Sequence, residues 1–211
     1  MVCQCLPARS HTQLLLLVLC FLLAAPHVVW AQDDGSPAPA EAAACPTIVR
    51  RAQWAAAKST NVTYQLKPVA NVIVHHTAGE RCTTVPSCKE MVRNIQTFHQ
   101  TQNGWSDIGY NFLIGNMHAY EGIGWHRTGA HLRGFNDKSI GVAFIGNFDQ
   151  ERPSARSLDT LARLLQCGVE LGELTDDYRL YGAQQLQSTN SPGRLLYAKL
   201  REFDHWSQEE F

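Results

Sequence analysis

Residues 71–79 have the sequence Asn71-Val72-Ile73-Val74-His75-His76-Thr77-Ala78-Gly79, an apolar, β-branched run that ends abruptly in two adjacent histidines. Such a run predicts a buried central strand. Because successive strand residues point to opposite faces, only one of His75 and His76 can face a given side of the sheet. Ligands commonly bind at strand carboxyl ends in α/β proteins, so both histidines are candidate site residues. The alternative is that one of them only hydrogen-bonds a neighbouring loop.

The flanking sequence predicts an α/β domain, a central sheet flanked by helices. Further strands are expected at 108–114, 117–121, 139–146 and 178–181, and helices at 89–101, 154–172 and 194–203. In the first of these helices, Met91, Val92, Ile95 and Phe98 recur at helical spacing and define the predicted inner face. The connection 122–134 is too rich in glycine for a helix and is a candidate binding loop.

The first 44 residues are expected to lie outside the folded domain. Residues 1–31 have an apolar core of about a dozen residues and small residues before a cleavage point after Ala31, which predicts a secretory signal peptide. Its core is shorter than the roughly 20 residues of a membrane-spanning helix. Residues 32–44 lack bulky apolar side chains and predict a disordered leader. Residues 45–211 then form a single domain of a secreted, extracellular protein.

The charge balance limits the classes of partner. Lys and Arg number 18 against 19 Asp and Glu, a formal net charge of −1. This balance gives no electrostatic basis for binding nucleic acid or an anionic membrane. No segment after the signal is apolar for long enough to span a membrane.

Four cysteines remain after signal cleavage, and an even number in a secreted chain predicts two disulfides with three possible connectivities. Cys82 and Cys88 are close enough to close one loop, which leaves Cys45 to pair with Cys167. Their spacing does not fit a zinc finger. Asn61 begins the sequon Asn-Val-Thr, which predicts an exposed, glycosylated loop.

Six short motifs follow one another along residues 45–206: Val74–Gly79, Asp107–Gly115, Tyr120–Trp125, Gly129–His131, Ser139–Gly146 and Ser191–Gly193. With these motifs the chain resembles the peptidoglycan recognition protein family, in its short, secreted, insect-type form. That family is related to phage-type N-acetylmuramoyl-L-alanine amidases. The resemblance implies a mixed sheet flanked by helices, with a peptide-binding groove on one face.

In catalytic members, the resemblance implies a zinc ion that activates water to cleave the bond between muramic acid and the first L-alanine of the stem peptide. Such a site needs three protein ligands, typically His, His and Cys, and an open fourth position. His75 matches the first histidine, and Tyr110 matches a tyrosine that assists near the oxyanion. Ala183 and Ser191 occupy the other two ligand positions. Zinc is therefore not expected as a cofactor, and the chain is expected to be non-catalytic.

Non-catalytic members use the same groove as a receptor site. The positions that match muramyl-peptide contacts, or lie beside them, are His75, His76, Thr77, His99, Tyr110 and His131. Imidazole, hydroxyl and backbone groups would bind the amides and carboxylates of the stem peptide. The alternatives are that each histidine is an ordinary buried, hydrogen-bonded group, or that His76, His99 or His131 rebuilds a zinc site.

Gly104 and Trp105 stand where the family discriminates the third residue of the stem peptide. This pair resembles members that prefer diaminopimelic acid, and Arg127 is a candidate partner for the additional carboxylate because of its charge and loop position. The alternative is that Trp105 only anchors the core. The family also often joins positions near Asn61 and Ser106 by a disulfide, which this chain lacks.

Two functions are therefore weighed. The leading hypothesis is a secreted innate-immune receptor that binds bacterial peptidoglycan and signals through a protease cascade or a membrane receptor. The alternative is a residual zinc-dependent amidase, or another peptidoglycan hydrolase that uses a serine such as Ser191. The sequence shows no nucleophile-elbow pattern and no evident histidine–carboxylate pair next to Ser191.

Overall fold

The computed structural model describes residues 45–211, which form a six-stranded mixed sheet covered by helices. The expected signal peptide and leader lie outside the described residues. The strand order is β1-β4-β3-β5-β2-β6; only β3 and β4 are antiparallel neighbours. The strands are β1 Ile48–Val49, β2 Val69–His76, β3 Phe112–Gly115, β4 His118–Glu121, β5 Ile140–Phe144 and β6 Leu174–Gly182. The predicted fold class is confirmed.

Strand β2 lies inside the sheet, as the apolar run predicts, with parallel neighbours β5 and β6 on its two sides. Val72 and Val74 are fully buried in the larger core, whereas Ile73 belongs to a separate cluster on the other face. His75 lies on the Ile73 face, because residues two apart in a strand share a face. The strand begins two residues earlier than expected and ends at His76.

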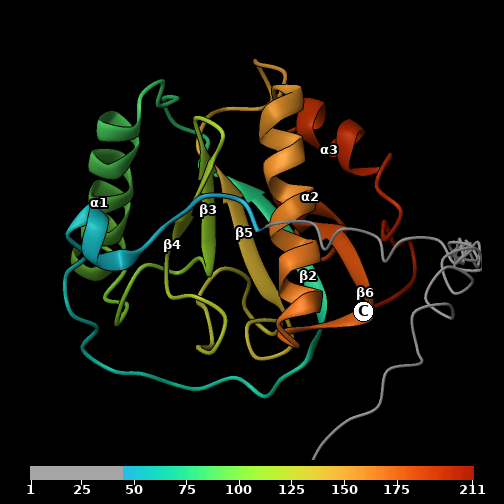
Figure 1. Ribbon diagram of the computed structural model, residues 1–211, viewed down its shortest axis with the longest axis horizontal. Coiled ribbons are helices and arrows are strands. Elements are labelled where there is room, and N and C mark those ends of the chain that lie inside the picture. Colours follow the sequence, from blue (N-terminus) through green and yellow to red (C-terminus); the bar gives the residue numbers. More distant parts are fainter. Residues whose placement is uncertain (1–44) are drawn as a thin grey trace, which may run out of the picture. The chain divides into compact units, whose positions relative to one another are not determined.

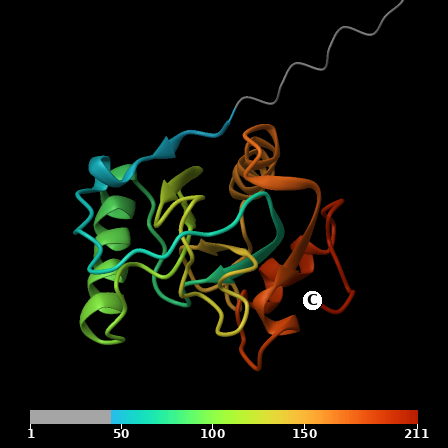
Figure 2. The same ribbon diagram turned by 90° about the horizontal axis from the view of Figure 1, so that it is seen from below.

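Three α-helices cover the sheet: α1 Val85–Thr101, α2 Ala155–Glu170 and α3 Arg194–Leu200. Two short 3-10 helices, η1 Arg51–Trp54 and η2 Ala183–Gln185, complete the elements. Figures 1 and 2 show α1 on one side of the sheet and α2 with α3 on the other. The hydrophobic clusters match this arrangement, because apolar residues of α2 and α3 share one cluster and Val92 of α1 belongs to another. No helix among residues 45–211 is both long and apolar enough to cross a membrane.

Helix α1 differs from its prediction in its start and its inner face. It begins four residues early because the Thr84 side chain accepts a hydrogen bond from the backbone N–H of Ser87 and caps the first turn. Phe98, expected to face inward, is 55% exposed. Gln96 is buried instead, because its amide donates to Asp107 Oδ1 at 2.6 Å. Side-chain hydrogen bonding, rather than apolar periodicity, sets this part of the helix face.

Two strands also differ in length from their predictions. Strand β3 starts at Phe112 rather than 108, because the backbone before it bonds to loops: the Ala130 N–H donates to Gly109 O at 2.9 Å. Strand β6 is longer than the expected 178–181, and Val69 of β2 already pairs with Leu174. The polar sequence of its first half concealed the first residues of this edge strand.

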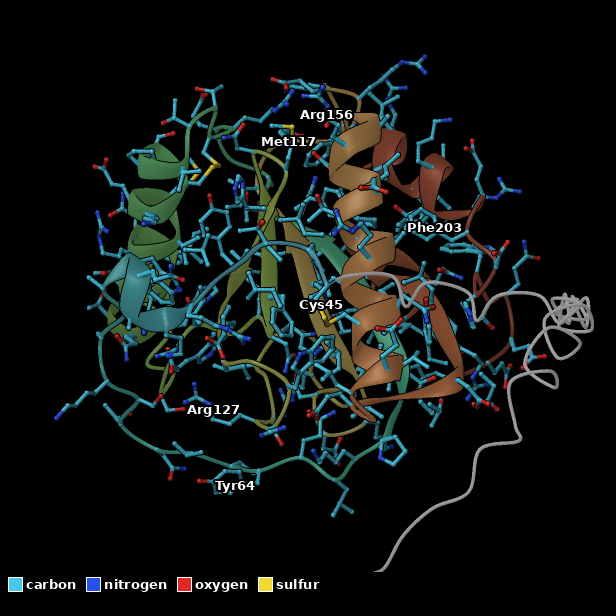
Figure 3. The ribbon with its side chains drawn as sticks, in the orientation of Figure 1. Cys45, Tyr64, Met117, Arg127, Arg156 and Phe203 are labelled. Atoms are coloured by element: carbon cyan, nitrogen blue, oxygen red, sulfur yellow. A yellow bond between two sulfur atoms is a disulfide. The ribbon has the colours of Figure 1, made fainter. Side chains whose placement is uncertain are left out.

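Both predicted disulfides are present. Cys45 joins Cys167 in α2 across 122 residues, and Cys82 joins Cys88 across six. Figure 3 shows Cys45 beside α2, where the amino-terminal segment of the described chain is attached. A cross-link between residues so distant in sequence restricts the unfolded chain far more than the short loop does.

Candidate functional site

A cluster of aromatic and imidazole rings lies at the carboxyl end of β2, on the face that α1 shares. His75 is 4% exposed to solvent. Its Nε2 atom lies 3.1 Å from Nδ1 of His131, and the centroids of its ring and that of Tyr110 are 5.5 Å apart. Tyr110 in turn lies 5.6 Å from His99 of α1, centroid to centroid. We call His75, His99, Tyr110 and His131 the ring cluster.

The hydrogen bonds around His131 assign the protons within the cluster. The Ser139 hydroxyl donates to Phe135 O at 2.7 Å, so its oxygen is free to accept from His131 Nε2, 3.5 Å away. His131 then has a lone pair on Nδ1 and accepts a hydrogen bond from His75 Nε2. In this arrangement the remaining nitrogen of His75, Nδ1, carries the free lone pair.

The loop that carries His131 is held by its own polar side chains. Asn136 Oδ1 accepts hydrogen bonds from the backbone N–H groups of His131 and Leu132, both at 2.8 Å. Gly141 of β5 leaves room for the imidazole, because an added Cβ there would lie 2.4 Å from two ring atoms of His131. The position of His131 thus depends on a glycine within a strand, a pattern that indicates close approach by another group.

His99 is fixed by a backbone hydrogen bond and by Trp105. The Gly109 N–H donates to His99 Nδ1 at 3.0 Å, so the proton of the neutral ring is on Nε2. The Trp105 ring packs on His99 with centroids 4.7 Å apart. Trp105 follows Gly104, whose φ of +67° favours glycine at the end of α1. Trp105 therefore supports a histidine of the ring cluster as well as ending the helix.

Burial keeps the ring cluster uncharged at neutral pH. Desolvation lowers the pKa of His99 to about 4 and that of His131 to about 4. It lowers the pKa of His75 well below its ordinary value, and the neighbouring imidazole of His131 lowers it further. Burial raises the pKa of Tyr110 to about 12, so its hydroxyl keeps its proton. The cluster consequently offers the neutral His99 Nε2–H and Tyr110 O–H as donors, which suit carbonyl and carboxylate oxygens, and His75 Nδ1 as an acceptor for an amide N–H.

Acid is expected to destabilise the protein through these histidines. Between the ordinary pKa of 6.5 and the folded value of about 4, the unfolded chain binds protons at His99 and His131 that the folded chain does not. The free energy of unfolding should therefore fall as the pH drops through this window. Urea denaturation at about pH 6.5 and about pH 4.5 measures the change. The free energy of unfolding of His131→Asn should fall less between these two pH values than that of the wild type. An equal fall in both proteins would contradict the assigned burial of His131.

His76 points away from the ring cluster, and Thr77 bonds to the loop that follows β5. His76 is 7% exposed, and its Nδ1 accepts a hydrogen bond from the backbone of Phe148 at 3.2 Å. Thr77 Oγ1 accepts from the Gly146 N–H at 3.0 Å. The alternation of side chains along β2 explains the separation of His75 from His76. The structure thus does not bring His76 into the group formed by His75, His99 and His131.

The two other positions matched to zinc ligands lie close to the end of β2. Val74 pairs with Gly182 of β6, so Ala183 follows at the place beside His75. Ala183 is fully buried in an apolar cluster with Ile73. Ser191 Oγ accepts a hydrogen bond from the His76 N–H at 3.0 Å. A methyl group and a neutral hydroxyl do not fit zinc, which prefers imidazole and thiolate here.

Trp105 and Arg127 line a common pocket of about 230 Å³, with walls from Ser59, residues 61–63, 105–108 and 127–130, and Ile123. Arg127 Nη1 lies 3.5 Å from Asp107 Oδ2 and donates to Ser59 Oγ at 2.8 Å. The guanidinium group is thus held in place before any ligand arrives. Asn61 is exposed at the rim of the same pocket.

Segment 55–68 is held against the pocket by main-chain contacts. Near the missing disulfide, the Thr60 N–H donates instead to Ser106 O at 3.0 Å. Further along, Tyr64 forms a bridge with Arg127, and Figure 3 shows both on the same side of the molecule. The pocket wall therefore has backbone support at the position where the resemblance implies a cross-link.

Sequence reasoning missed the residues that support the ring cluster. Ser139, Asn136 and Gly141 fix the His131 ring, yet only Gly141 left a signal, as a glycine inside a predicted strand. In the described part of the chain, no group of three or more His, Cys, Asp and Glu side chains is arranged to hold a metal ion.

Comparison with known proteins gives a consistent result. A family model described as N-acetylmuramoyl-L-alanine amidase matches residues 65–194. Peptidoglycan-recognition protein 2 of Holotrichia diomphalia is 45% identical over 165 residues, which are 78% of this chain and 87% of that protein.

Two solved structures have the same fold as this chain. Drosophila peptidoglycan recognition protein SA superposes with a TM-score of 0.77 at 43% identity, covering 79% of this chain and 97% of that one. Peptidoglycan recognition protein LE, solved in complex with tracheal cytotoxin, gives a TM-score of 0.75 at 40% identity, covering 76% and 96%.

Proposed function

This chain belongs to the peptidoglycan recognition protein family, whose domain is that of the N-acetylmuramoyl-L-alanine amidases. We propose that it is a secreted receptor that binds bacterial muropeptides without cleaving them. Secretion is inferred from the signal-like sequence of residues 1–31. We further propose that it acts through a downstream immune protein, either in a protease cascade or at a membrane receptor.

The ring cluster is the observation that carries the binding proposal. It places the rings of Tyr110 and His131 beside that of His75, and the ring of His99 beside that of Tyr110. A buried, hydrogen-bonded histidine is common, but the neutral donors of His99 and Tyr110 together with the free Nδ1 of His75 suit a peptide ligand, whose amide groups need both donors and acceptors. Peptidoglycan carries such groups, since its stem peptide contains amides and free carboxylates.

The donor set supports binding without cleavage. A zinc site of this family needs three ligands, and only His75 of the three matched positions can supply one. Ala183 is enclosed by apolar side chains, and the Ser191 oxygen is occupied by the His76 N–H. The competing proposal of a serine hydrolase lacks support for the same reason: the hydrogen bond to Ser191 comes from backbone rather than from an imidazole base.

The pocket at Trp105 supports a preference for the diaminopimelate type of stem peptide. Arg127 holds its charge at the wall of that pocket, where the additional carboxylate of diaminopimelic acid would find a partner. Protein LE, with which this chain shares 40% identity, was solved with a monomeric diaminopimelic acid-type peptidoglycan. A lysine side chain would bring a second positive charge toward Arg127.

Calorimetric titration with purified diaminopimelate-type and lysine-type muropeptides tests this proposal. Wild type should bind both, and the diaminopimelate type about tenfold more tightly, a difference typical of one charge-assisted hydrogen bond. Tyr110→Phe should weaken binding by about tenfold, because it removes one hydroxyl donor. Tyr197→Phe is the matched control, since it makes the same change in α3, on the opposite side of the sheet from α1. No binding of either muropeptide would contradict the proposal.

A further inference from the structure

A third, small apolar cluster lies on the face of the sheet that carries His75, separate from the two larger cores. Its buried members are Ile73, Leu132 and Ala183, and three half-buried side chains, Phe135, Leu186 and Phe211, pack against them. Leu132 immediately follows His131. The cluster therefore joins the end of the described chain to the loop that carries a histidine of the ring cluster.

Backbone hydrogen bonds guide the last residues of the chain to this cluster. Residues 204–211 run along the free side of β6: the Leu180 N–H donates to His205 O at 2.8 Å, and the Ser207 N–H donates to Leu180 O at 3.0 Å. Gln185 Nε2 donates to Ser207 O at 2.9 Å. Figure 1 shows this segment beside β6, and the letter C there marks its end. We call residues 204–211 the terminal strap.

The strap ends in an aromatic contact with the loop. The Phe211 ring meets the Phe135 ring edge to face, with centroids 4.7 Å apart, and lies 5.5 Å from the ring of Tyr181. Edge-to-face pairs of this kind stabilise packing beyond the apolar area that they bury. Phe211 is thus packed between β6 and the loop 131–139.

Phe135 connects this packing to His131. Its carbonyl oxygen accepts the Ser139 hydroxyl, whose oxygen lies 3.5 Å from His131 Nε2. His131 Nδ1 in turn lies 3.1 Å from His75. A shift of Phe135 would therefore move the Ser139 hydroxyl, the acceptor that fixes the Nε2 proton and the orientation of the His131 ring.

We propose that Phe211 is a positioning residue for the muropeptide site: by packing on Phe135, it holds the loop 131–139 so that His131 stays aligned with His75. This inference rests on the proposed function for the identity of the ligand, a muropeptide, but not for the alignment of His131 with His75. Phe211 itself belongs to the apolar cluster rather than to the ring cluster, and it acts through Phe135 and Ser139.

The test compares Phe211→Ala with Phe211→Leu, and uses Leu171→Ala as a control for the loss of an exposed apolar side chain at the end of α2. Two readouts are taken: the imidazole NMR signals of His131 and His75 in the ligand-free protein, and the affinity for a diaminopimelate-type muropeptide. Phe211→Ala should shift both histidine signals and weaken binding about tenfold, because sub-ångström alignment of a site depends on its support. Phe211→Leu should restore most of the affinity, and Leu171→Ala should change neither readout.

Unchanged histidine signals in folded Phe211→Ala would overturn the inference and leave the receptor proposal standing. Conversely, a wild type that binds no muropeptide would contradict the proposed function, while the ligand-free signals would still decide the role of Phe211. If Phe211→Ala does not fold, Phe135→Leu disrupts the same aromatic pair from the other side, and the same shift is expected.

Discussion

A chain that carries both Ala183→His and Ser191→Cys is expected to bind zinc with an apparent dissociation constant below about 1 µM and to release stem peptide from peptidoglycan. The strand register places residue 183 beside His75, and the Ser191 side chain reaches the backbone at the end of β2. His75 is already oriented by its hydrogen bond to His131, which leaves Nδ1 free as a ligand atom.

The single variants are the controls for this prediction. Each supplies only two of the three ligands, so each should bind zinc much more weakly than the double variant and release no peptide. Zinc binding is measured by competition with a chromogenic chelator, and peptide release by chromatography. A folded double variant without zinc affinity would contradict the assignment of Ala183 and Ser191 to the ligand positions.

Gly141→Ala is expected to weaken muropeptide binding by about a hundredfold, or about 2.7 kcal/mol. The added Cβ would lie 2.4 Å from Cγ and Cδ2 of His131, a separation that two carbon atoms cannot adopt. The strand cannot yield easily, because the Gly141 N–H donates to Asn111 Oδ1 and its carbonyl accepts from the Asn111 N–H. The His131 ring must therefore turn away from His75, which breaks the ring cluster at its centre.

Titration with a muropeptide and urea denaturation measure the two consequences of this substitution. Unfolding should become easier by about 1–3 kcal/mol, the usual cost of overpacking. Gly79→Ala is the matched control, since a Cβ there meets only Thr77 O at 4.0 Å. In the double variant Gly141→Ala, His131→Ala, the loss of stability should be smaller than the sum of the single losses, because the collision is gone. Additive losses would show that the collision is not the cause.

The order of strands and helices could be predicted because apolar runs and turn residues are local signals. The 71–79 run and its two histidines led directly to the central strand, and the nearby pair Cys82 and Cys88 indicated the disulfide pattern. The inner face of α1 could not be predicted in the same way. Gln96 is buried because Asp107, eleven residues away, accepts its hydrogen bond, and no periodicity reports such a partner.

In the candidate site, too, some features follow from the sequence and others depend on tertiary contacts. The resemblance named the histidines and Trp105, but the side of the sheet that each faces depends on strand alternation and loop packing. His76, one residue from His75, bonds to the backbone of Phe148 instead of joining the ring cluster. Phe211 and Phe135 are far apart in sequence and meet only because the terminal strap follows β6. Such support comes from tertiary contacts, which a single sequence does not display.

The most direct test of binding without cleavage uses the wild-type protein and peptidoglycan of both types, over a range of zinc concentrations. Retained ligand and released stem peptide are measured in the same samples, with the double variant Ala183→His, Ser191→Cys as the positive control for release. The account predicts that wild type retains muropeptide and releases no stem peptide at any zinc concentration. Zinc-dependent release by the wild type would contradict it and would mean that other side chains replace the two missing ligands.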